Sequence, residues 1–484
     1  MNPELRDKYE TVIGIESHVQ LATKSKLFCG CDNDAREAEP NTLVCPVCFG
    51  LPGALPVLNQ HAVELALRLG TALNAEYPAK LHTKFDRKNY FYPDLPMGYQ
   101  ISQFDEPIVP GGYVEFPFDA GTKRVGITRA HLEADAGKLT HPDGKPYSLV
   151  DLNRSGTPLV EIVSEPDMRS AAEAKGYAQE LHNLVRYAGV SDANLYYGNM
   201  RFDVNVSVRP KGQTEFGTRT ETKNLNSFRA IERVVEYETR RQIVLVEHGD
   251  KVKQETRGWN DAKQQTYGMR SKEDADEYRY FPEPDLPPLV IPRAKVEANS
   301  KFDYLPADLR QLLAKAGIAA REAEVLVGEP ELAALWYQAH KLDPKHSRFV
   351  FTWLTGPEIS LRQPGSNGEP TKSKLTAEIL NQVGQMVADR KLSSTNSREL
   401  LTALRLQPDD PEKVAKAKGL IQESDEGELG KVVDAVMAAN PQAVADFKAG
   451  NQRAFGALVG AAMKATQGKG NPPLITKLFK DRLS

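Results

Sequence analysis

The alternation of apolar and polar residues over Thr11–Leu21 predicts a strand. Successive side chains of a strand point to opposite faces, and four apolar residues share one face of this strand: Ile13, Ile15, Val19 and Leu21. Glu16, His18 and Gln20 share the other face, where residues two apart lie roughly 7 Å from each other. A carboxylate and an imidazole at this spacing can reach one metal ion or one substrate. A half-exposed strand with a polar outer face also explains the pattern, and such strands are common.

Three further segments predict strands: Val125–Asp135, Leu159–Val163 and Asp203–Val208. The first places four polar residues on one face: Arg129, His131, Glu133 and Asp135. In the second, Glu161 stands in a run so apolar that its carboxylate needs a cation or a hydrogen-bond donor. The third sets Asp203, Asn205 and Ser207 opposite three valines.

Apolar residues recur at helical spacing in three segments: 59–73, 170–189 and 228–249. Asn59 is placed to cap the first of these helices. Ser170 and Glu173 form a capping-box pattern at the start of the second, and Gly189 stands where that helix should stop. We expect these helices to be structural.

The chain of 484 residues is too long for one ordinary core. From about residue 296 it changes to alanine-rich and leucine-rich helical segments, and a proline-containing stretch at 407–411 precedes a last group of short helices. We therefore predict an α+β protein with a mixed-sheet domain over 1–295, an all-helical domain over 296–405 and a small helical tail domain over 410–484.

Composition and charge exclude several classes of protein. The chain is 40% hydrophobic and 26% charged, which is typical of globular domains. It has no apolar run approaching the roughly 18 residues that a membrane span needs, and its charged N-terminal segment lacks the apolar core of a signal peptide, so we expect a cytoplasmic protein. A net charge of −3 excludes a uniformly basic surface.

A nucleic-acid partner would therefore have to contact a local basic stripe. Residues 448–484 contain seven lysines or arginines and a single acidic residue, which fits such a stripe. A solvated helical face would have the same composition.

All four cysteines fall in one short window: Cys29, Cys31, Cys45 and Cys48. The pairs Cys-x-Cys and Cys-Pro-Val-Cys resemble the knuckles of a structural zinc site. Disulfides and inert buried thiols are the alternatives, and a cytoplasmic location disfavours disulfides. Four thiolates leave a zinc ion no open position, so we expect this ion to brace the fold.

The polar strand faces together offer five residues for a metal site: Glu16, His18, Glu133, Glu161 and Asp203. If the strands belong to one sheet, these side chains converge into a carboxylate-rich site that suits Mg²⁺ or Mn²⁺. The alternative is that each acid forms a separate ion pair with a nearby arginine. Sequence alone does not give the strand order.

Two segments offer cations for anionic ligands. Lys84–Asp94 mixes aromatic residues with Lys84, Arg87 and Lys88, and it is as consistent with a structural loop as with a ligand-contacting one. Lys223 and Asn224 precede the third predicted helix, where they either contact a substrate or position the start of the helix.

Several long motifs resemble the B subunits of the aspartyl/glutamyl-tRNA amidotransferases. The matching segments are Gly14–Leu21, Lys84–Gln103, His131–Lys138, Asp151–Asp167 and Lys223–Phe228. The resemblance runs to the C-terminus, and these motifs are long enough to be specific.

The resemblance implies a catalytic cradle domain, a helical domain and a tail domain that contacts tRNA. It implies an ATP-dependent ligase that activates the side-chain carboxylate of Glu-tRNA(Gln) or Asp-tRNA(Asn) as an acyl phosphate and amidates it. The implied partners are the amidase (glutaminase) subunit, which delivers ammonia from glutamine, the small third subunit of the amidotransferase and the misacylated tRNA. A non-discriminating synthetase is a further candidate partner. The sequence does not decide between the two tRNA substrates.

The resemblance also implies roles for site residues. Glu16, His18, Glu133 and Glu161 would hold Mg²⁺, with Asp203 as a further ligand or a support for one. The residues that would contact ATP or the aminoacyl end are Lys84, Lys88, Arg154, Lys223 and Asn224. His18 is the least typical ligand for Mg²⁺, and the alternative role for it is to orient a carboxylate.

This chain departs from its relatives in one motif, since many of them carry a second acid where Ala134 stands here. It has no Walker-type loop, and no glutaminase motif of its own. A non-catalytic, zinc-containing tRNA-binding scaffold protein is the competing interpretation.

Overall fold

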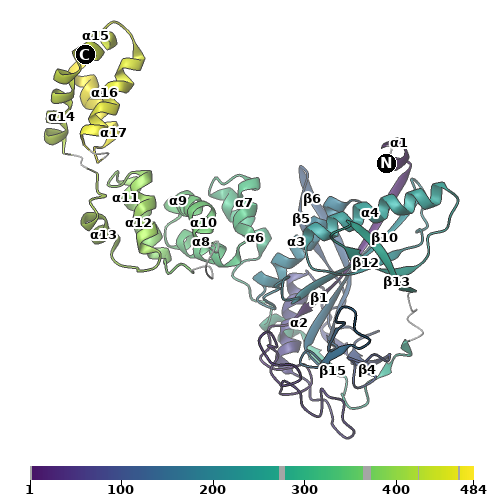
Figure 1. Ribbon diagram of the computed structural model, residues 1–484. Coiled ribbons are helices and arrows are strands. Elements are labelled where there is room, and N and C mark those ends of the chain that lie inside the picture. The colour runs from purple at the N-terminus through teal and green to yellow at the C-terminus, as the bar shows by residue number, and fades with distance from the viewer. Residues whose placement is uncertain (1–2, 272–277, 363–371, 423–424, 467–468, 484) are drawn as a thin grey trace. The chain divides into compact units, whose positions relative to one another are not determined.

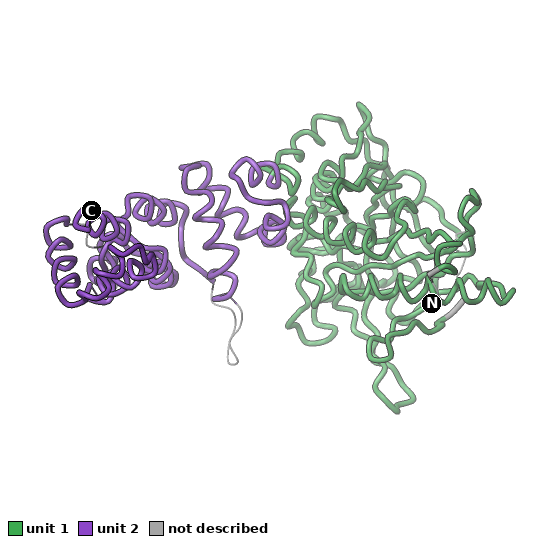
Figure 2. The backbone as a smooth tube through the Cα atoms, turned by 90° about the horizontal axis from the view of Figure 1, so that it is seen from above, with its two compact units in different colours: residues 1–308 green, residues 309–484 purple. Residues whose placement is uncertain are grey.

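The computed structural model describes residues 3–271, 278–362, 372–422, 425–466 and 469–483. The predicted ranges 1–295, 296–405 and 410–484 also include residues that lie outside the described ones, namely 1–2, 272–277, 363–371, 423–424, 467–468 and 484. The chain forms two compact units, residues 1–308 and 309–484 (Figure 2). Within the described residues, every helix is too short or too polar to cross a membrane.

A mixed sheet organises the first unit (Figure 1). Its described strands follow one another in this spatial order: β13 (Gln265–Ser271), β12 (Glu255–Asn260), β11 (Thr220–Leu225), β10 (Met200–Pro210), β1 (Tyr9–Gln20), β9 (Pro158–Ser164), β6 (Gly121–Ala134) and β5 (Gly112–Phe118). β11 and β12 are parallel, and the other neighbours are antiparallel. The strands predicted from the sequence correspond to β10, β1, β9 and β6, which are consecutive. The predicted α+β fold is confirmed.

Helices α2 (Gln60–Ala72), α3 (Ala171–Tyr187) and α4 (Phe228–Glu247) cover one face of this sheet (Figure 1). Their buried residues share one core with Ile13, Ile15 and Val19 of β1. Burial of this apolar surface holds the helices on the sheet. The opposite face of β1, which carries Glu16 and His18, is thereby left for polar chemistry.

The predicted helix caps are present. The side chain of Asn59 accepts a hydrogen bond from the backbone N–H of His61, and that of Ser170 accepts one from the N–H of Glu173. These bonds satisfy donors that the first turn of a helix otherwise leaves unpaired. Gly189 follows α3 with a φ of 66°, a conformation that glycine adopts without strain.

Shorter sheets carry the loops beside the large one. They are β14 (Phe281–Pro282) with β3 (Asp86–Asn89) and β4 (Tyr99–Ser102), β15 (Leu289–Pro292) with β2 (Lys80–Thr83), and β7 (Lys138–Thr140) with β8 (Leu149–Asp151). The side chain of Ser102 in β4 donates a hydrogen bond of 3.4 Å to Glu133 Oε2 in β6. The predicted cation-rich segment at 84–94 therefore forms part of a small sheet next to the polar face.

The first unit extends beyond residue 295, because α5 (Arg293–Ala298) buries Val296 in its core and Phe302 packs against that core. The unit boundary falls within α6 (Pro306–Lys315). A short helix, α1 (Pro3–Arg6), precedes the first strand.

The second unit is helical. Its main helices are α7 (Ala320–Val327), α8 (Pro330–Leu342), α9 (Ser347–Trp353), α10 (Ile359–Arg362), α11 (Ala377–Ala388), α12 (Ser394–Leu404), α13 (Pro411–Ala417), α14 (Glu426–Ala439), α15 (Pro441–Lys448), α16 (Gln452–Ala465) and α17 (Pro472–Leu483). Helices α14, α16 and α17 share a core that contains Leu429, Val433, Leu458, Ile475 and Phe479. The last helices therefore have an apolar core of their own.

Candidate active site

The polar face of the large sheet places four titratable side chains next to one another. His18 of β1 lies opposite Glu161 of β9, and Glu161 lies opposite His131 of β6. Directly opposed residues of antiparallel strands point to the same face, so these three side chains form a row across three strands. Glu133 joins them because it follows His131 by two positions on β6. We call this group the histidine–glutamate centre.

Short distances join the members of the histidine–glutamate centre. His18 Nε2 lies 3.7 Å from Glu133 Oε1 and 3.6 Å from Glu161 Oε2. His131 Nε2 lies 3.3 Å from Glu161 Oε2 and 3.7 Å from Glu133 Oε2. The Glu133 side chain is only 3% exposed and that of His18 is 18% exposed, so His18 is the more accessible of the two.

The charges of the centre depend on one another. Burial alone lowers the pKa of His18, but the hydrogen bond and charge of Glu161 outweigh it and raise this pKa to about 9. Burial likewise lowers the pKa of His131, while Glu161 and Glu133 raise it to about 8. Burial raises the pKa of Glu161, but the two histidines hold it well below its usual range. Both imidazoles therefore hold protons at neutral pH, and a cation that binds His18 would displace the proton from that ring.

The donors of the centre fit a small divalent cation. One ligand atom each from His18, Glu133 and Glu161 lies within 4.8 Å of the others. Ligands of an octahedral Mg²⁺ ion lie about 3.0 Å apart when adjacent and about 4.2 Å apart when opposite. The separations of 3.6 and 3.7 Å fall between these values. Two carboxylates are the ligands that Mg²⁺ or Mn²⁺ prefers, and the imidazole is the less typical member for Mg²⁺.

The other two predicted acids lie in a second group. Glu16 is opposite Asp203 of β10, and a ligand oxygen of each lies within 4.8 Å of one from Glu221 of β11. We call these three residues the acidic cluster. Glu16 does not join the histidine–glutamate centre, because it stands one row along β1 and faces Val163 of β9 instead of Glu161. The structure thus brings together three of the four predicted magnesium ligands and places the fourth beside Asp203.

Lys223 supplies the counter-charge of the acidic cluster. Its Nζ lies 3.0 Å from Asp203 Oδ2 and 3.3 Å from Glu221 Oε1. Burial alone lowers the pKa of Lys223, but these two acids raise it above its usual range. The backbone N–H of Asn224 donates to Asp203 Oδ1 at 2.8 Å, with a φ of 60°. Burial, followed by the charges of Glu161 and Glu221, raises the pKa of Glu16.

Lys88 is the cation of the 84–94 segment that faces the centre. Its ammonium lies 4.8 Å from the centre of the Tyr278 ring. Burial alone lowers the pKa of Lys88, but the neighbouring Tyr280, Glu133 and Glu161 raise it above its usual range. Lys88 therefore keeps its positive charge next to the two carboxylates.

The other two predicted ligand-binding cations have partners within the protein. Lys84 Nζ lies 2.9 Å from Asp105 Oδ1 and 3.7 Å from Asp86 Oδ1. Arg154 Nε lies 3.1 Å from Asp135 Oδ2, and this arginine also donates to the backbone at Gly137. These contacts anchor both side chains in loops around the polar face.

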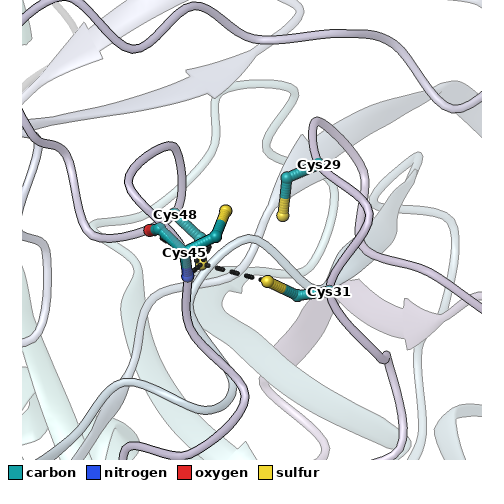
Figure 3. Close-up of side chains that lie close together, drawn as sticks. All are labelled: Cys29, Cys31, Cys45 and Cys48. Atoms are coloured by element: carbon teal, nitrogen blue, oxygen red, sulfur yellow. Dashed lines mark hydrogen bonds between the residues drawn. The ribbon is translucent and has the colours of Figure 1, made fainter.

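The four cysteines form a compact cluster between two loops (Figure 3). Cys29 and Cys31 come from one loop and Cys45 and Cys48 from the other, and their sulfur atoms all lie within 4.8 Å of one another. The backbone N–H of Cys45 donates to Cys48 Sγ at 3.2 Å. A hydrogen bond from Cys29 lowers the pKa of Cys48 to about 4, so a thiolate forms readily. Such a cluster could hold a metal such as zinc.

A buried lysine lies against the cysteine cluster. Lys26 is fully buried, and its Nζ donates to the carbonyl of Leu43 at 2.8 Å and to Cys48 Sγ at 3.6 Å. A buried ammonium needs an anion, and a thiolate at Cys48 provides one. The lysine in turn offsets part of the negative charge that four thiolates bring together.

The sequence pattern does not single out two residues of the site. It places His131 only on a polar strand face, yet His131 contacts both glutamates of the centre. Glu221 lies on β11, a strand that the apolar pattern of the sequence does not predict. The alternation of His131 with Glu133 was a usable signal for the first. Glu221 had none, because its strand lacks an alternating apolar pattern.

Comparison with known proteins gives full-length similarity. The family described as the GatB/GatE catalytic domain matches residues 11–297, and the one described as the GatB domain matches residues 343–483. The chain is 45% identical over 482 residues to a protein from Carboxydothermus hydrogenoformans that is named as the B subunit of the aspartyl/glutamyl-tRNA(Asn/Gln) amidotransferase, covering 99% of both chains. It is 46% identical over 493 residues to a protein of the same name from Paraburkholderia xenovorans, again with 99% of each chain covered.

Proposed function

The chain belongs to the family of aspartyl/glutamyl-tRNA(Asn/Gln) amidotransferase B subunits, and from this premise we propose that it activates and amidates the amino-acid side chain on misacylated tRNA. The substrates are Glu-tRNA(Gln) or Asp-tRNA(Asn), ATP and ammonia. The ammonia comes from glutamine hydrolysed by a partner amidase subunit, and a small third subunit completes the enzyme.

The reaction needs two steps because a carboxylate does not react directly with ammonia. In the first, a carboxylate oxygen of the substrate attacks the γ-phosphorus of ATP, the bond to the β-phosphate oxygen breaks, and ADP leaves. In the second, the ammonia nitrogen attacks the carbonyl carbon of the acyl phosphate, phosphate leaves with the bonding electrons, and the nitrogen loses a proton. Both steps depend on positioning and on neutralising phosphate charge.

The histidine–glutamate centre is the observation that carries this proposal. His18, Glu133 and Glu161 would hold Mg²⁺, which neutralises phosphate oxygens when bound. His131 keeps both glutamates in place through its contacts of 3.3 and 3.7 Å. The acidic cluster, with Glu16 and Asp203, fixes the neighbouring Lys223 beside the centre.

The surrounding cations suit the anionic substrates. Lys88 and Lys223 both keep their positive charge, since acids beside them raise their pKa. Each can therefore donate to a phosphate oxygen or to the substrate carboxylate without changing its protonation state. Asn224, Lys84 and Arg154 would position the loops that contact ATP or the aminoacyl end.

The remaining parts have supporting roles. We propose that the four-cysteine cluster holds structural zinc, and that the basic helices within residues 410–484 contact tRNA. The cysteines suit a closed zinc site because all four sulfur atoms already face one another. We propose that the protein acts in the cytoplasm, where the tRNA substrates are made.

The test uses the assembled amidotransferase with γ-labelled ATP and glutamyl-tRNA or aspartyl-tRNA. Glu133→Gln and Glu161→Gln should each reduce phosphate transfer to the aminoacyl group by about 100-fold or more, because each removes one carboxylate of the centre. Glu165→Gln is the matched control, since Glu165 follows β9 and hydrogen-bonds only Thr128 through its side chain among the described contacts. It should leave transfer unchanged.

Two further readouts separate catalysis from binding. tRNA affinity and glutaminase activity should stay within about twofold of the unmodified enzyme, because neither depends on the centre. Supplying ammonium chloride in place of glutamine should not restore amide formation in the two variants. Full phosphate transfer in both variants would favour the non-catalytic, zinc-containing scaffold instead.

A further inference from the structure

A bulge in β6 turns an arginine toward the polar face. Ile127 pairs with Ser164 of β9, whereas Arg129 pairs with Val163, so Thr128 is an extra residue on β6. Val125 and Ile127 before the bulge are buried in the core. After the bulge, the odd-numbered residues Arg129, His131 and Glu133 lie on the opposite face, which carries the histidine–glutamate centre.

Arg129 lacks a partner, unlike four other arginines of this sheet whose side chains the structure describes. Within the described residues, no ion pair or hydrogen bond involves its guanidinium, and its Nε is buried without an acceptor. Other arginines on these strands are paired with acids: Arg124 with Glu115, Arg201 with Asp135, Arg209 with Glu10 and Arg257 with Glu238. A half-buried guanidinium without an acceptor is costly, unless a ligand supplies one.

Other polar atoms of the same face also lack partners. His131 Nδ1 and Asn205 Oδ1 are buried and unsatisfied among the described residues. His131 lies on β6, next to β9, and Asn205 lies on β10, next to β1. The strands β1 and β9 between them carry Glu16, His18 and Glu161. Unmet donors and acceptors gathered around one site indicate that a polar ligand, with its water, occupies this face.

The position of Arg129 relative to the centre selects the ligand. Residues two apart on a strand are about 7 Å apart, so the Cα of Arg129 lies about 7 Å from that of His131. Val163, the partner of Arg129, is also opposite Glu16, which puts Arg129 about two strand spacings, or roughly 10 Å, from Glu16. A phosphate group held at the centre therefore comes within reach of the guanidinium.

Resting on the proposed function, we infer that Arg129 binds the terminal phosphates of the nucleoside triphosphate. The planar guanidinium donates two parallel hydrogen bonds to phosphate oxygens, which lysine cannot do. A phosphodiester of tRNA is the other anion of this chemistry. It is less suitable, because a half-buried arginine one row from the centre is shielded from a long polynucleotide backbone.

The test compares Arg129→Gln and Arg129→Lys in the assembled amidotransferase. Arg124→Gln is the matched control, since Arg124 lies on the same strand before the bulge, is exposed and is paired with Glu115. We expect Arg129→Gln to lower kcat/KM for ATP by about 30-fold or more and to leave KM for tRNA within about twofold. Arg129→Lys should recover part of the loss, and the control should match the unmodified enzyme. Thermal unfolding of each variant shows whether it is folded.

The outcomes distinguish this inference from the proposed function. If Arg129→Gln behaves like the control, or raises only KM for tRNA, the inference is wrong. Equilibrium binding of a non-hydrolysable ATP analogue to the same complexes provides a readout without catalysis, and equal affinity of Arg129→Gln and the unmodified enzyme also overturns it. Absence of phosphate transfer by the unmodified enzyme, with analogue binding still weakened by Arg129→Gln, would refute the proposed function and leave nucleotide binding by Arg129 supported.

Discussion

His182 makes the stability of the first unit depend on pH. It lies on α3, and its Nε2 is 3.1 Å from the carbonyl oxygen of Ala193. Its ring packs edge-on against Phe228, with 5.4 Å between ring centres. Burial, and then the charge of Arg186, lowers the pKa of His182 from 6.5 to about 4. The folded protein therefore holds this imidazole neutral.

The sign and size of the effect follow from this shift. At a pH below about 6.5, the His182 imidazole is protonated in the unfolded chain but stays neutral in the folded protein. The contribution of His182 to the free energy of unfolding is therefore present at higher pH and is lost as the pH falls. With pKa values of about 4 folded and about 6.5 unfolded, the loss is about 2 kcal/mol between about pH 7.5 and about pH 5. It approaches about 3 kcal/mol below about pH 4.

The assay compares unmodified protein with His182→Gln, which cannot titrate but keeps a donor for Ala193. Urea unfolding of the full chain is measured across this pH range, with the other titrating groups common to both proteins. As the pH falls from about 7.5 to about 5, we expect the unmodified protein to lose about 2 kcal/mol more free energy of unfolding than His182→Gln loses. Arg186→Gln should raise the pKa of His182, as read from the histidine NMR signal. Parallel pH profiles for His182→Gln and unmodified protein would refute the reasoning.

Further predictions concern the cysteine cluster and the tail. Freshly purified protein should contain one zinc ion per chain, and Cys48→Ser should abolish it, as metal analysis can show. Lys26→Met should keep the zinc but release it about 10-fold faster to a chelator, because it removes a charge-assisted hydrogen bond to Cys48; unchanged release would contradict that role. Deleting residues 410–484 should weaken tRNA binding and reduce its salt dependence while glutaminase activity stays unchanged, since basic residues concentrate there. Identical salt slopes with and without the tail would exclude it as a tRNA contact.

The sequence predicted the elements that have one apolar and one polar face. β1 was found because Ile13, Ile15 and Val19 pack under helices while Glu16 and His18 do not. The pattern does not predict β11, because its residues are mostly polar. It forms a strand because it lies between β10 and β12, which pair with both of its hydrogen-bonding edges. Thr220, Glu221 and Thr222 are all buried there, and the side chains of Thr220 and Glu221 hydrogen-bond to Glu238 and Thr256. Alternation therefore detects a strand only where one of its faces meets a core.

The division of the acids into two groups depends on pairing between distant segments. Glu16 and His18 are neighbours on one strand face, yet Glu16 lies opposite Val163 and Asp203 while His18 lies opposite Glu161. The relevant rows run across the strands, and their register is set by long-range pairing that a single sequence does not reveal.

The single extra residue in the β6 bulge determines which side chains of this strand face the core. In a regular strand, the numbering that buries Val125 and Ile127 would also turn Arg129, His131 and Glu133 toward the core. That face is packed with apolar side chains, where unpaired charges would cost several kcal/mol each. The extra residue at Thr128 reverses the side on which the second half of β6 points, while Ala130 and Leu132 take over the contact with the core. The sheet can therefore use one strand first to build its core and then to supply a histidine, a glutamate and an arginine to the proposed site, with no break in its pairing to β9 beyond the bulge.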